Sequence, residues 1–228
     1  MIPHSTRLIA AVLPVLFFGA TSAHSQTLNW ASLTGSDIVD SHGDPLDHTF
    51  VFELGAFDEN FIPDETNVSD WSAHWNVFDS TSTLVGGSAE YAYTAEGGGY
   101  FTGTRDVQAV TSYSSLFEGM TAYLWIRNGD LTEHFLTTST AKPGNAAWLF
   151  PTLDPGCCPN GKVTTWSVSN LGDDVPLWGS QWDQHGGGQS YSPGPYDIQT
   201  HMIPEPSGLL LLAMGCGFFV TRRRRSSF

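Results

Sequence analysis

The sequence predicts a mainly β fold, an antiparallel β-sandwich of jelly-roll type, for the central part of a 228-residue chain. Three observations support this prediction. Short stretches alternate apolar and polar residues, as half-buried strands do. Clusters of Gly, Asn, Asp and Pro separate these stretches and are typical of turns. Only one short segment has helical spacing, and many strands with little helix indicate packed antiparallel sheets.

Five stretches are predicted strands. In the first, residues 48–54, Phe50 and Phe52 share one face, Leu54 follows them and Val51 points the other way. The other four are residues 89–94, 120–127, 133–138 and 163–169. The stretch 120–127 (MTAYLWIR) is the most apolar, so we expect it at the centre of a sheet. The turn Asn128-Gly129-Asp130 predicts a hairpin that joins it to 133–138.

One segment, residues 69–78, has helical spacing. Trp71, Trp75 and Phe78 occur at i, i+4 and i+7, which is the spacing of one helix face. Ser69 and Asp70 both have side chains suited to an N-cap. The segment therefore predicts one or two helical turns.

The first 25 residues are typical of a secretory signal peptide. Arg7 supplies a positive start, residues 8–20 are apolar, and small residues follow at 21–25. We therefore expect an export translocon and a signal peptidase to act on the chain. The exported part divides into a β-sandwich body at 26–183 and a polar, Gly-rich stretch at 184–202, which predicts a flexible tether.

The segment 203–228 has three parts. Pro204, Glu205 and Pro206 come first, an uncharged apolar run at 207–221 follows, and Arg222, Arg223, Arg224 and Arg225 come next. An apolar run before a cationic block predicts a membrane helix whose charged end stays cytoplasmic. As a helix the run would rise about 22 Å, against about 30 Å for a bilayer core. It is therefore short for a permanent anchor.

This segment resembles the PEP-CTERM sorting domain, which is also labelled an ice-binding protein C-terminal domain, although that label does not imply ice binding. The resemblance implies that an exosortase-like membrane enzyme acts near Pro204-Glu205-Pro206. The protein would then be held transiently in the inner membrane and released to the cell surface or extracellular matrix. An ordinary tail anchor is the alternative.

The body resembles uncharacterised exported PEP-CTERM proteins. The similarity lies in residues 52–57 (FELGAF), 61–63, 122–126 (AYLWI), 133–137 and 148–151 (WLFP), and in Trp71 and Trp75. This second resemblance implies a type of domain, and it implies no activity.

Charge and cysteine content exclude several classes of protein. Residues 26–202 carry four cationic side chains against 22 acidic ones, a formal charge of −18, which disfavours nucleic acid and anionic lipid as partners. The three cysteines, Cys157, Cys158 and Cys216, are too few for a disulfide scaffold and do not have zinc-site spacing.

No catalytic motif is present. The sequence lacks Gly-x-Ser-x-Gly, His-Glu-x-x-His, phosphate-loop and dinucleotide-binding patterns. Glu53, Glu118 and Glu133 lie beside aromatic strands, but no two of them are spaced as a glycosidase pair. The histidines are expected to be surface or edge residues. The sequence therefore favours a protein that is not an enzyme.

Two candidate ligand sites remain. Asp37, Asp40, Asp44 and Asp47 fall within eleven residues around a Gly43-containing turn, and such a loop could bind calcium or be a solvated acidic loop. Trp178 and Trp182 lie in a polar segment and are expected to be exposed, where their rings could stack on the sugars of an extracellular polysaccharide. Four other tryptophans, Trp71, Trp75, Trp125 and Trp148, lie among apolar residues and are expected in the core.

The leading interpretation is an exported cell-surface or matrix protein without catalytic activity, sorted by its C-terminal signal. A carbohydrate-binding module, calcium-dependent or not, is the first alternative. A secreted glycoside hydrolase is the second.

Overall fold

The structure, a computed structural model, describes residues 26–33, 35–47, 49–82, 89–93, 99–143, 145–153, 161–171, 174–190 and 192–204. The predicted signal peptide and the predicted membrane helix at 207–221 lie outside these residues. Among the described residues, no helix is long and apolar enough to cross a membrane.

The described chain is mainly β, with strands arranged in three sheets. The first has the order β5-β6-β1-β9, the second β13-β8-β7-β3-β4, and the small third β11-β10-β12-β2. Strand pairs are antiparallel except β1 with β9 and β2 with β12, which are parallel. The strands are β1 (Gln26–Ala31), β2 (Ile38–Val39), β3 (Phe50–Phe57), β4 (Trp75–Ser82), β5 (Ala89–Tyr93), β6 (Gly99–Asp106), β7 (Tyr123–Asn128), β8 (Glu133–Thr137), β9 (Lys162–Ser167), β10 (Ser180–Gln181), β11 (Gln184–His185), β12 (Ile198–Gln199) and β13 (His201–Met202).

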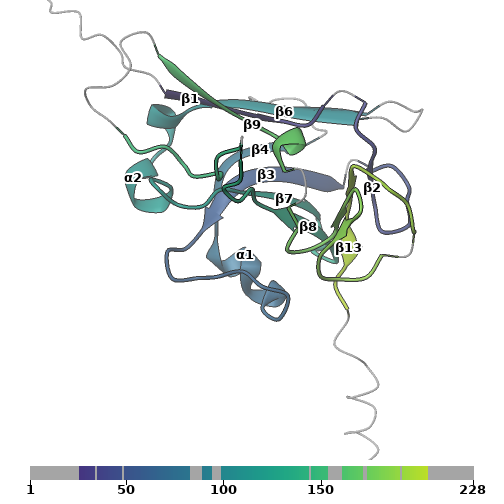
Figure 1. Cartoon of the computed structure of the whole chain (residues 1–228). Coiled ribbons are helices and arrows are strands. Elements are labelled where there is room, and N and C mark those ends of the chain that lie inside the picture. The colour runs from purple at the N-terminus through teal and green to yellow at the C-terminus, as the bar shows by residue number, and fades with distance from the viewer. Residues whose placement is uncertain are drawn as a thin grey trace, which may run out of the picture.

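Helical segments are short. They are η1 (Val68–Asp70), α1 (Trp71–His74), η2 (Val107–Ala109), α2 (Tyr113–Leu116) and η3 (Val168–Asn170). In Figure 1, β1, β6 and β9 form one layer above β3, β4, β7 and β8, and α1 lies on the far side of the second layer.

The main core lies between the two larger sheets. Leu28, Trp30 and Phe101 enter it from the first sheet, and Phe52 and Leu124 enter it from the second. The Phe101 ring lies 5.5 Å from the Trp30 ring and 5.0 Å from the Phe52 ring, so the two layers are in direct aromatic contact. Aromatic pairs at such spacing add stability beyond the area they bury.

A second core covers the other face of the five-stranded sheet. Phe57, Trp125 and Leu136 point to this face, where Trp71 and Trp178 from neighbouring segments pack on them. Strand side chains alternate between faces, so Trp125 faces the second core while Leu124 and Ile126 face the first. Two covered faces explain why β7 and β8 are apolar on both sides.

The predicted strands and the hairpin are confirmed. Each of the five predicted stretches overlaps a strand, and β7 is the middle strand of its sheet. The β7–β8 pairing places Arg127 opposite His134 and Leu124 opposite Thr137. Asn128 closes the hairpin, because its side-chain oxygen accepts hydrogen bonds from the backbone N–H groups of Thr132 and Glu133, both at 2.9 Å.

The predicted helix at 69–78 is only partly correct. Helix α1 ends at His74, and Trp75 begins β4 by pairing with Phe57. Asp70 is the N-cap residue, but its side chain makes no capping hydrogen bond. The spacing of Trp71, Trp75 and Phe78 fits a helix locally, but the ladder with β3 satisfies more backbone groups, and tertiary pairing outweighs the local pattern.

The prediction of a flexible tether at 184–202 is wrong. This segment contains β11, β12 and β13, and Ile198 is fully buried. Its glycines allow close packing, since an added Cβ on Gly187 would lie 2.6 Å from the Trp178 ring, and one on Gly188 would lie 2.6 Å from the Cβ of His201. The folded body therefore continues past residue 183, to Ile203, whose N–H bonds the Thr132 carbonyl at 2.8 Å.

Candidate functional site

The predicted sorting motif, residues 204–206, begins directly after the last residue that bonds to the folded body, Ile203. Met202 pairs with Glu133 on β8 and exchanges backbone hydrogen bonds with Gln189. Pro204 is the last residue the structure describes, two residues beyond β13. Glu205, Pro206 and the four arginines at 222–225 lie outside the described residues.

The prediction that Trp178 and Trp182 are exposed is wrong. Trp178 is 3% exposed, and its indole N–H donates to the His201 carbonyl at 3.0 Å. Trp182 is half-buried against the main core, and its indole N–H donates to Asp197 Oδ1 at 2.7 Å. Both rings have partners inside the fold. They do not form an open stacking platform.

The four aspartates proposed for calcium do not converge. Asp40 Oδ1 accepts the backbone N–H groups of His42 and Asp44. Asp47 Oδ1 accepts the backbone N–H and the hydroxyl of Thr49. Asp37 lies instead beside Asp197, whose Oδ2 accepts the Asp37 backbone N–H. Burial raises the pKa of Asp37, and the neighbouring Asp197 carboxylate raises it further. Among the described residues, no three His, Cys, Asp or Glu side chains are placed to hold a metal.

Calcium binding at this loop stays a prediction, and the geometry gives it no support. Its test is the thermal midpoint of the protein with millimolar calcium and with a chelator. Equal midpoints would remove calcium from consideration.

The glutamates considered for glycoside hydrolysis are engaged by the fold. Glu53 is 5% exposed, and both its oxygens accept hydrogen bonds from Arg127, at 2.9 and 3.2 Å. Trp75 also donates its indole N–H to Glu53, at 2.9 Å. Glu133 is 8% exposed and accepts the Ser41 hydroxyl at 2.6 Å and the Thr200 hydroxyl at 2.8 Å. Glu118 Oε1 accepts the Leu153 N–H at 2.8 Å.

Ser180 lies between two histidines that the sequence placed in a tether. Its Oγ is 2.6 Å from Nε2 of His201 and 2.8 Å from Nδ1 of His185. Nδ1 of His201 is 2.8 Å from the Gly187 carbonyl, which can only accept, so Nδ1 carries the hydrogen. Burial lowers the pKa of His201, whose Nε2 therefore accepts the Ser180 hydroxyl.

A hydroxyl that donates to a neutral imidazole is the arrangement of an activated serine. Ser180 and His201 are only 2% and 3% exposed, however. The cluster therefore joins β10, β11 and β13, and it presents no nucleophile at the surface. Sequence reasoning missed it because the three residues share no local spacing.

His134 is buried rather than at a surface or edge. It is 2% exposed, and neither ring nitrogen makes a hydrogen bond with the described part of the chain. Its ring lies 5.2 Å from the Trp125 ring and 6.0 Å from the Trp71 ring. Burial lowers the pKa of His134 to about 4, the Leu131 carbonyl opposes this shift, and Arg127 adds to it.

An open pocket lies beside α1. Its volume is about 290 Å³, and it is lined by Asp58, Glu59, Asn60, Phe61 and His74. Nδ1 of His74 lies 3.0 Å from Asp58 Oδ2, and the His74 ring stacks on Phe61 at 4.2 Å. The sequence gave no sign that His74 would face Asp58, because 16 residues separate the two.

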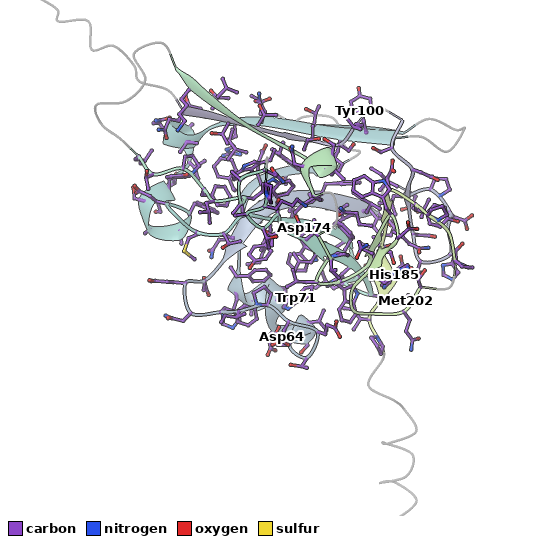
Figure 2. All side chains as sticks on the ribbon, in the orientation of Figure 1. Asp64, Trp71, Tyr100, Asp174, His185 and Met202 are labelled. Carbon is purple, nitrogen blue, oxygen red and sulfur yellow. The ribbon has the colours of Figure 1, made fainter. Side chains whose placement is uncertain are left out.

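Figure 2 places Trp71 and Asp64 on the side of the molecule that carries α1, and His185 and Met202 near β13. The pocket and the serine–histidine cluster therefore occupy different parts of the body. Ser180 and His201 of the cluster are buried, whereas the pocket is open to solvent.

Comparisons with known protein families, curated proteins and solved structures give no significant match to this chain. The fold defines a mainly β domain, and its function has to be argued from its own residues.

Proposed function

We propose that this chain is an exported cell-surface or extracellular-matrix protein, sorted through its C-terminal PEP-CTERM-like signal by an exosortase-like membrane enzyme. The order Pro-Glu-Pro, apolar run and arginine block supports the proposal. The hydrogen bond from Ile203 to Thr132 also supports it, because the folded body extends to Ile203, the residue directly before the motif.

We also propose that the protein acts without catalysis. Glu53 and Glu133, two of the acids considered for hydrolysis, accept hydrogen bonds from Arg127 and Thr200 of the fold itself. Ser180 is held in the same way. The two larger sheets share one core, which supports an antiparallel β-sandwich of jelly-roll type as the architecture.

Cell fractionation with intact-mass measurement tests the sorting proposal. The wild-type protein is expected in the surface or extracellular fraction, without residues 1–25 and without the mass of the tail beyond the motif. Substitution of Pro204, Glu205 and Pro206 by alanine should leave the protein in the inner membrane with its tail.

The matched control is Pro193→Ala with Pro195→Ala, which removes the exposed second Pro-x-Pro of the chain and should not alter sorting. A surface fraction in which the wild-type protein keeps residues 205–228 would contradict the proposal. It would favour an ordinary tail anchor.

A further inference from the structure

The surface pocket between residues 58 and 74, hereafter the 58–74 pocket, has the size of a small-ligand site. Its volume of about 290 Å³ lies near the lower end of the range of ligand pockets, about 300–1,000 Å³. Asp58, Glu59 and Asn60 are exposed, while Phe61 and His74 are half-buried. The polar side chains therefore face solvent, and the two aromatic rings form the floor of the pocket.

His74 is held in one orientation. Asp58 Oδ1 accepts the Asn76 amide at 2.8 Å, and Asp58 Oδ2 faces Nδ1 of His74 at 3.0 Å. The hydrogen bonds from Asn76 and then His74 lower the pKa of Asp58, so its carboxylate stays ionised and accepts. Nδ1 of His74 therefore carries a hydrogen, and in the neutral ring Nε2 is an acceptor.

The ring plane of His74 is fixed as well. Phe61 stacks on it with an interplanar angle of 16°. Phe61 is itself positioned by the turn from Asp58, whose carbonyl accepts the Phe61 N–H at 2.8 Å, and by the buried Phe57 ring at 5.3 Å. The backbone N–H of Asp58 bonds the His74 carbonyl at 2.9 Å. The pocket is therefore organised before any ligand arrives.

The groups of the pocket suit a neutral ligand with several hydroxyl groups. The pocket offers acceptors at Glu59 and at Nε2 of His74, a donor and acceptor amide at Asn60, and the apolar ring of Phe61. Two carboxylates disfavour an anionic ligand. A metal ion is also disfavoured, because within the described chain no three ligating side chains converge. Both carboxylate oxygens of Asp58 already have hydrogen-bond partners, His74 and Asn76. The site therefore favours a ligand that forms hydrogen bonds over a cation.

We propose that the 58–74 pocket binds a sugar unit of a neutral polysaccharide. In this arrangement His74 Nε2 and Glu59 accept hydrogen bonds from sugar hydroxyls. Asn60 bonds a third, and the part of the Phe61 ring that His74 leaves uncovered contacts the apolar face of the sugar ring. The proposal does not depend on the sorting route, so it and the proposed function can fail separately.

Affinity electrophoresis of the full-length protein tests this inference, with dextran, β-glucan, galactomannan or alginate cast in the gel. At least one neutral polysaccharide should retard the protein, and anionic alginate should not. His74→Ala should weaken the retarding affinity about tenfold, as expected for the loss of one hydrogen bond to an oriented group. Asp58→Asn should weaken it less, because it changes only the group that orients His74.

The controls match these substitutions. His42→Ala removes an exposed histidine that also lies near an aspartate, and Asp64→Asn removes an exposed carboxylate that accepts hydrogen bonds from Thr66. Both should keep the wild-type affinity. An NMR titration of the wild-type protein with oligosaccharides of the retarding glycan should shift the His74 ring signals and leave those of His42 in place, so the test holds even if a variant fails to fold.

Three results would overturn the proposal. The first is that no neutral polysaccharide retards the protein, and the second is that His74→Ala binds as well as wild type. The third is an NMR titration in which the His74 ring signals do not move while the glycan binds.

Discussion

Replacement of His134 by leucine should remove a large part of the acid sensitivity of the fold. His134 lies between Trp71 and Trp125 with both ring nitrogens unbonded within the described chain, and its pKa falls to about 4. In the unfolded chain the pKa of a histidine returns to about 6.5. The unfolded state therefore binds more protons between these two values, and stability is lost as the pH falls from about 6.5 towards 4.

The magnitude follows from the two pKa values. Between pH 7.5 and pH 4.5 the difference in proton binding at His134 costs the folded state about 2.5 kcal/mol. His134→Leu has no such titration and leaves no unpaired ring nitrogen in the core. Urea unfolding of both proteins at the two pH values should show that the wild type loses about 2.5 kcal/mol more than the variant.

The control is His42→Leu, because His42 is exposed and its replacement leaves His134 in place. This variant should keep the full acid-dependent loss. Carboxylates with lowered pKa, such as Asp58 and Asp174, add acid sensitivity equally in all three proteins. Equal losses in the wild type and in His134→Leu would refute the reasoning, because the histidine would then be protonated or solvated in the folded state.

Three further substitutions test the packing. Arg127→Met should cost about 3 kcal/mol in urea unfolding, because it leaves the buried Glu53 carboxylate without its cation, and adding Glu53→Gln should recover part of that loss. Gly188→Ala should cost about 2 kcal/mol more than Gly119→Ala by the same measurement; both have positive φ, but only Gly188 is crowded. Ser180→Ala should lower the thermal midpoint by a few degrees, since two histidines lose their shared hydroxyl.

The sequence was sufficient to predict those elements of the fold that depend on residues close together in the chain. The alternation of Phe50, Phe52 and Leu54 against Val51 placed one face of β3 in the main core. The Asn128 turn predicted the β7–β8 hairpin, and the structure shows the Asn128 side chain closing it. These signals are reliable because the strand period and the turn geometry act over a few residues.

The partners of α1 could not be predicted in this way. The spacing of Trp71, Trp75 and Phe78 is compatible with a helix, and nothing near them in the sequence shows that Trp75 pairs with Phe57. The 58–74 pocket depends on the same contact, since α1 and the start of β4 bring His74 to Asp58. A site built by long-range pairing leaves no fixed spacing in the sequence.

The Gly-rich segment at 184–202 shows why a prediction from amino-acid composition failed at the end of the body. Few apolar residues and many glycines suggested a flexible tether at 184–202 and exposed rings for Trp178 and Trp182 just before it. In the structure the missing side chains of Gly187 and Gly188 let the backbone approach Trp178 and His201 to contact distance. Glycine here allows burial of its large neighbours. The same packing carries the fold to Ile203, the residue directly before the predicted Pro204-Glu205-Pro206 motif.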